Sequence, residues 1–225
     1  QLKFLYMNTI KQLVFHRFKT FSLLSVSMLF SIVLLMIRMK LTHSFFYLFL
    51  VWNLFLAVIP FAITAYLMST PKLNKFWLVF WFGVWLLFLP NAPYIVTDLL
   101  HLKISNTPFL WLDILVVLSF ACNGLLLFFM SLKDMKGILF SLMKKTKVNY
   151  SITSILFLTG FGVYLGRFLR YNSWEILSNP KYLFIDIVNI IIQPFSNSEA
   201  WLFTLLFGSF LSIGFWMFNN LKDSN

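Results

Sequence analysis

The residues best suited to chemistry lie in residues 89–102, which read LPNAPYIVTDLLHL. Asp98 and His101 stand three residues apart there, although the chain has only seven Asp and Glu residues and three His residues. The two prolines predict a break in the preceding helix; if a new helix follows them, Tyr94, Asp98 and His101 share one face. An Asp and a His so placed can bind a cation or exchange a proton, or Asp98 only fixes the tautomer of His101. They are the candidate acid and base, and Asn91 and Tyr94 are candidate ligand contacts.

Three further charged residues belong to the predicted site. Asp113 lies more than one turn inside a predicted helix, so its carboxylate needs a partner or a proton. Arg167 and Arg170 stand three residues apart, and we expect their guanidiniums to project together and bind a phosphate or carboxylate. The alternatives are that they extend to lipid headgroups or form ion pairs with Asp98 and Asp113.

An oxygen-rich site for a divalent cation such as Mg²⁺ or Mn²⁺ is a second interpretation of the acidic residues. Its candidate ligands are Asp98, Asp113 and Glu175, although Glu175 also completes a capping box with Asn172. The sequence has no glycine-rich phosphate loop, no paired-histidine zinc motif and no Gly-x-Ser-x-Gly turn. Whether the protein is an enzyme stays open, and this cation is the only cofactor that the residues suggest.

Composition identifies an integral membrane protein. The chain has 225 residues, of which 60% are hydrophobic and 11% charged, whereas soluble domains carry about 25% charged residues. The net charge of +11 comes from Lys and Arg between apolar segments, and no nucleic-acid-binding motif accompanies it. The charge therefore suits anionic lipid and not nucleic acid. The single cysteine, Cys122, forms no internal disulfide.

Segments of about 20 apolar residues predict an all-α, polytopic transmembrane helical bundle. Six spans are predicted, at residues 21–37, 45–68, 76–89, 109–132, 152–169 and 201–218. Residues 182–195 form a seventh apolar segment, which is short and carries a polar stripe, so an interfacial or re-entrant helix is favoured over a seventh span. In the fifth span, Gly162 and Gly166 have the spacing that lets another helix approach closely.

Charge also sets the expected orientation. Twelve Lys and Arg residues lie on one side of the predicted spans and four to six on the other, which places the basic arm, residues 1–20, in the cytoplasm. Residues 21–218 then form a single transmembrane domain, and residues 219–225 form a short tail. The 89–102 stretch, the end of the fifth span and the 182–195 helix fall on the extracytoplasmic side.

The motifs carry a resemblance. LPNAPYIVTDLLHL, Trp111-Leu112-Asp113 and the segment GRFLRYNSWE (166–175) together resemble the signature of a family of bacterial integral membrane proteins known only as a domain of unknown function. The resemblance covers residues 21–218. It implies a multi-pass protein of the bacterial cytoplasmic membrane with these segments as its signature, and it implies no activity.

These residues predict a polar pocket on the extracytoplasmic side that binds, and in one version translocates, an anionic lipid or a small anion. Arg167 and Arg170 would hold the anion. Asp98, His101 and Asp113 would release it by protonation, or bridge it through a cation. Two alternatives stay open: a non-catalytic subunit of a larger envelope assembly, and a membrane-embedded hydrolase or transferase that uses the divalent cation. Membrane lipids are the expected partners, and a protein partner or a second copy of the chain is left open.

Overall fold

The computed structural model describes residues 17–70, 73–104, 108–171 and 180–223. Within these ranges all regular secondary structure is helical. Six helices are long and apolar enough to cross a membrane: Phe18–Thr42, Phe46–Ser69, Lys75–Lys103, Leu110–Phe140, Lys145–Arg167 and Ser198–Asn220. The predicted all-α fold with six spans is therefore confirmed.

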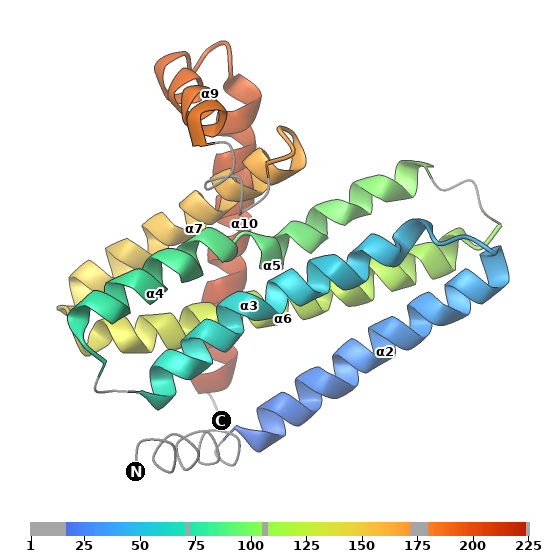
Figure 1. Cartoon of the computed structure of the whole chain (residues 1–225), viewed down its shortest axis with the longest axis horizontal. Helices are drawn as coiled ribbons and strands as arrows, with labels where there is room; N and C mark the ends of the chain where they lie inside the picture. The colour runs from blue at the N-terminus through green and yellow to red at the C-terminus, as the bar shows by residue number, and fades with distance from the viewer. Residues whose placement is uncertain (1–16, 71–72, 105–107, 172–179, 224–225) are drawn as a thin grey trace.

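The described ranges contain ten helical elements, of which all but α9 belong to these spans. They are α2 (Phe18–Thr42), η1 (Phe46–Leu48), α3 (Phe49–Ser69), α4 (Lys75–Phe88), α5 (Asn91–Tyr94), η2 (Ile95–Ile104), α6 (Leu110–Phe140), α7 (Lys145–Arg167), α9 (Pro180–Ile192) and α10 (Ser198–Asp223). In Figure 1, α2, α3, α6 and the α4–α5–η2 segment run roughly along one direction, whereas α10 crosses them and packs mainly on α7.

Helix α6 is the centre of the bundle. It contacts α2, α3, α5 and η2 along its 31 residues, and it contributes fully buried side chains such as Val116, Phe120 and Phe128. Lipid tails are as apolar as these side chains, so close packing must hold the helices together in place of the hydrophobic effect. Small residues at the helix contacts therefore determine how closely the helices can pack.

The two prolines interrupt the preceding helix as predicted, because α4 ends at Phe88, but the membrane span continues past them. Leu89 and Pro90 keep helical dihedral angles, and the Tyr94 N–H donates to the Pro90 carbonyl at 3.0 Å. Proline fits because its fixed φ of about −65° is already helical; its cost is a missing N–H donor. The span thus continues beyond the predicted 76–89 to Lys103.

Two glycines let α5 lie in direct contact with its neighbours. A Cβ at Gly162 of α7 would lie 2.6 Å from Pro90 Cγ, and a Cβ at Gly124 of α6 would overlap the Ala92 carbonyl oxygen. The predicted close approach at Gly162 and Gly166 is confirmed, because the approaching residues are Pro90 and Tyr94. The α5 turn is therefore wedged between α6 and α7.

Helix α9 covers the end of α7. With 13 residues, it is not among the helices long enough to span a membrane, in agreement with six spans. It is held by a hydrogen bond from the Tyr171 hydroxyl to Asp186 Oδ2 at 2.7 Å and by one from Trp201 Nε1 to the Ile190 carbonyl at 3.0 Å.

Candidate functional site

Arg167, in the last turn of α7, gathers the polar side chains of η2. Its Nη2 donates to Asp98 Oδ1, its Nε donates to Thr97 Oγ1 at 2.8 Å, and its Nη1 lies 3.1 Å from His101 Nε2. The guanidinium carbon also lies 4.3 Å from the centroid of the Tyr94 ring, a cation–π contact. Each guanidinium nitrogen therefore has a partner within the protein.

Asp98 is fully buried and has a second partner that the sequence analysis did not consider. Asn53 of α3 donates through Nδ2 to Asp98 Oδ2 at 2.9 Å. The two carboxylate oxygens are thus bound by a cation and by an amide, which stabilises the charged form in a buried setting. Asn53 gave no sequence signal beyond being a polar residue within an apolar span.

His101 belongs to the same network, but Asp98 does not set its tautomer. The distance from His101 Nε2 to Asp98 Oδ1 is 3.9 Å, too long for a hydrogen bond. Since a guanidinium can only donate, the contact with Arg167 makes Nε2 an acceptor and leaves the proton of neutral His101 on Nδ1. The rings of Phe46 and Phe49 stand edge-on to the imidazole at centroid distances of 6.0 and 5.0 Å.

The geometry of η2 explains why these groups meet. We expected an α-helix after the prolines, but residues Ile95–Ile104 form a 3-10 helix. Side chains three residues apart eclipse each other in a 3-10 helix, so Asp98 and His101 point the same way. Tyr94 is four residues from Asp98 and lies in α5, so it is not eclipsed with them, but all three side chains contact Arg167.

Asp113 does not join this cluster. It pairs with Arg38 of α2, whose Nε donates to Asp113 Oδ1 at 2.8 Å, and both side chains are buried. Arg38 also donates to the Ser44 carbonyl at 2.9 Å and lies over the Tyr47 ring at 4.7 Å. Arg38 directly follows the first predicted span, 21–37, and was expected to be a loop charge. The need of Asp113 for a partner was the signal that could have identified it.

Arg167 and Arg170 do not form the expected pair of adjacent guanidiniums. Helix α7 ends at Arg167, and Arg170 lies beyond the end with a left-handed φ of 62° and an exposed side chain. Arg170 has no ion pair with any acidic residue in the described ranges. Because α7 ends between the two arginines, their side chains lie in different environments. The three-residue spacing alone does not show where the helix ends.

The acidic residues proposed as metal ligands do not assemble in the described part of the chain. Asp98 and Asp113 are bound to different arginines, and no three His, Cys, Asp or Glu residues come together within the described ranges. Glu175 and Asn172 lie outside the described residues. The expected divalent-cation site therefore has no support from the residues whose positions are known.

A large cavity borders the Arg167 network. It has a volume of about 960 Å³ and is lined from α3, α4, α5, α7, α9 and α10, at the upper end of the range for small-molecule sites, about 300–1,000 Å³. Asn53 and Tyr94, which contact Asp98 and Arg167, belong to its wall. None of the described lining residues is charged.

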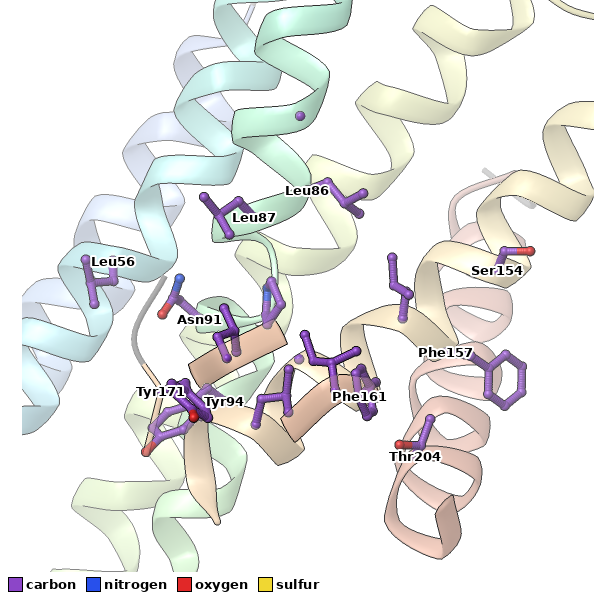
Figure 2. A pocket seen from close by; sticks show the side chains of 18 of the residues that line it. Leu56, Leu86, Leu87, Asn91, Tyr94, Ser154, Phe157, Phe161, Tyr171 and Thr204 are labelled. Carbon is purple, nitrogen blue, oxygen red and sulfur yellow. The ribbon is translucent and has the colours of Figure 1, made fainter. Parts of the chain in front are cut away.

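Apolar side chains line most of the cavity, and an amide and two phenol groups lie together at one end (Figure 2). Its α7 wall comprises residues on one face between Tyr150 and Gly166, including Phe157, Leu158 and Phe161. In Figure 2, Asn91, Tyr94 and Tyr171 gather at one end of the cavity, away from Ser154 and Thr204. Asn91 and Tyr94 were predicted as ligand contacts from the sequence. The α7 residues of the wall were not, because their spacing is also typical of helix packing.

Comparisons with known proteins extend this description to a family. A family model described as "Protein of unknown function (DUF1361)" matches residues 52–213, a range that includes Asn53, the α5–η2 segment and Arg167. Comparison with curated proteins and with solved structures found no match. The protein is thus a multi-pass membrane protein that belongs to the DUF1361 family, whose function is unknown.

Proposed function

We propose that the protein binds a membrane amphiphile in the cavity between α3, α4 and α7. The observation that carries this proposal is the shape of the cavity. Its α7 wall, from Tyr150 to Gly166, extends over about 24 Å at about 1.5 Å per residue. That length is most of the hydrocarbon thickness of a bilayer, about 30 Å. An elongated apolar cavity of this kind suits hydrocarbon chains.

The cavity wall includes side chains that reach the surface of the bundle. Tyr150, Leu158 and Ile191 line the cavity and are exposed, and they belong to apolar helices. In a membrane such a surface faces lipid and not water. A hydrocarbon chain could therefore enter from the side, with its polar head toward Asn91, Tyr94 and Tyr171.

The other interpretations have less support. A metal-dependent hydrolase or transferase would need Asp98 and Asp113 to share a cation, yet each holds its own arginine. A purely structural role agrees with the direct Arg38–Asp113 and Arg167–Asp98 pairs, but it does not account for the cavity beside the second pair. Binding of an anion through Arg167 is also disfavoured, since its charge is paired with Asp98 and each guanidinium nitrogen already contacts Asp98, Thr97 or His101.

For orientation, we propose that the N-terminal side is cytoplasmic. Support comes from the excess of Lys and Arg on that side. The polar end of the cavity, level with the end of α7, would then lie toward the extracytoplasmic side of the bilayer.

The test introduces a large side chain into the cavity at a position where it causes no steric clash. Gly83 of α4 lines the cavity, and a Cβ built there meets no atom within 4 Å, so Gly83→Phe should place a ring inside it. Gly137 of α6 is equally open but is not part of the wall, which makes Gly137→Phe the matched control. Lipid retained by the purified protein is measured by native mass spectrometry.

We expect wild type and Gly137→Phe to retain bound lipid and Gly83→Phe to lose most of it. Equal retention by Gly83→Phe and the control would overturn the proposal. Absence of retained or exchangeable lipid on the wild-type protein would overturn it as well.

A further inference from the structure

We infer that the ligand of this cavity is a lipid with an uncharged, oxygen-bearing head, and that the Tyr94 hydroxyl donates a hydrogen bond to it. The inference rests on the proposed function, because it concerns the same cavity. It departs from the anionic ligand that the sequence suggested.

The charges around the cavity are already balanced. No charged side chain is among the described residues of the wall. Arg167 stands behind Tyr94, and its charge is offset by the buried carboxylate of Asp98. An anionic head would thus enter a weakly solvated space without a counter-ion, and burying an unpaired charge is strongly unfavourable. An uncharged head avoids that cost.

The wall nevertheless offers hydrogen-bonding groups. The Tyr94 hydroxyl has no hydrogen-bond partner in the described part of the chain, while its ring lies under the Arg167 guanidinium at 4.3 Å. A cation over the ring draws electron density from the phenol, which makes its O–H a better donor. On the other side of the ion pair, Asn53 uses Nδ2 for Asp98, and no described residue donates to its Oδ1.

The Tyr94 hydroxyl can donate to a ligand, and Asn53 Oδ1 can accept from one. A hydroxyl group does both. The head group that fits is therefore an alcohol, as in a diacylglycerol or a long-chain alcohol. A phosphate monoester would lose its hydration on entering the cavity and would find no cation among the described residues of the wall to compensate for that loss.

Arg170 is the place where an anionic head would otherwise bind. It is exposed and precedes Tyr171, which lines the cavity. If Arg170 held a phosphate there, anionic lipid would win over its uncharged counterpart, and removal of the guanidinium would abolish the preference. Arg170→Gln is therefore included in the test.

The experiment compares two lipids with the same acyl chains, one with a hydroxyl head and one with a phosphate head. Purified wild-type protein is titrated with dioleoylglycerol and with dioleoyl phosphatidic acid in the same detergent, and binding is followed by native mass spectrometry. We expect dioleoylglycerol to bind at least about tenfold more tightly. Tyr94→Phe, which keeps the ring under Arg167, should weaken dioleoylglycerol binding about fivefold and leave phosphatidic acid unchanged.

The controls separate the possible failures. Tyr182→Phe removes a hydroxyl from an exposed residue outside the cavity wall and should change neither affinity, and thermal unfolding checks that each variant is folded. Tighter binding of phosphatidic acid, above all if Arg170→Gln removes it, overturns the inference. So does an unchanged dioleoylglycerol affinity in Tyr94→Phe. If neither lipid binds in a manner that Gly83→Phe blocks, the proposed function itself is wrong.

Discussion

Two buried arginine–aspartate pairs in this protein have the same chemistry and different surroundings. Arg38 and Asp113 have side chains that are 3% and 0% exposed, and they join α2 to α6 away from the residues that line the cavity. Arg167 and Asp98 are 11% and 1% exposed, and their contacts Tyr94 and Asn53 belong to the cavity wall.

The difference shows how one kind of contact can serve two roles. The first pair is closed on all sides by protein and by the Tyr47 ring, so it can only hold helices together. The second pair holds α7 against η2 and also fixes the two cavity-wall groups, Tyr94 and Asn53. We therefore expect the first pair to matter most for stability, and the second to matter for stability and ligand binding together.

The largest effect is expected at the closed pair. Asp113→Leu leaves the Arg38 cation buried without its carboxylate, and loss of one partner of such a pair costs about 3–5 kcal/mol of unfolding free energy. Denaturant unfolding in detergent measures it. The double variant Arg38→Met/Asp113→Leu, which removes both charges, should recover most of the loss; a double variant no more stable than the single one would contradict the assignment.

A smaller loss is expected at the second pair. Asp98→Ala should cost about 2 kcal/mol, because Arg167 keeps Thr97 and His101 as partners and is slightly exposed. The comparison also predicts that Asp98→Ala lowers lipid retention, since Asn53 and Tyr94 lose their fixed positions, whereas Asp113→Leu affects only stability. Denaturant unfolding measures the stability and native mass spectrometry the retained lipid. Equal lipid retention in wild type and Asp98→Ala would contradict a role of the second pair in ligand binding.

The wedge that positions the second pair can be tested through its glycine contacts. Gly124→Ala would force a methyl group into the backbone oxygen of Ala92, and overpacking of this kind costs about 1–3 kcal/mol. Gly137→Ala, on the same helix with open space around it, should stabilise the protein by up to about 1 kcal/mol. Thermal unfolding distinguishes the two, and similar melting temperatures would refute the close approach.

The smallest effect is expected at Arg170, and it sharpens the contrast with Arg167. Arg170 adopts a left-handed conformation that costs about 1 kcal/mol in a residue other than glycine. Arg170→Gly should therefore raise stability by about that amount, while Arg170→Ala should not. Neither substitution should change retention of dioleoylglycerol, whereas Arg167→Ala should lower both stability and retention.

Much of the fold followed from the sequence, and part of the site did too. Six spans could be counted because each needs a long apolar segment in a bilayer. The polar face at Tyr94, Asp98 and His101 could be located because charged residues are rare in such segments. The partners could not be assigned: Asp113 was grouped with Asp98 because both were expected on the same side of the membrane, and Arg167 with Arg170 because they stand three residues apart.

The sequence alone determined that this chain is a membrane protein, how many spans it can form, and which polar residues within the spans need partners. Those properties depend on local apolarity and on the cost of burying each charge. Only the tertiary structure decided that Arg38 takes Asp113, that Arg167 takes Asp98, and that a cavity remains beside the second pair. Pairing and empty space depend on how helices from distant parts of the chain pack, here at the glycines that receive α5, and no local pattern encodes that geometry.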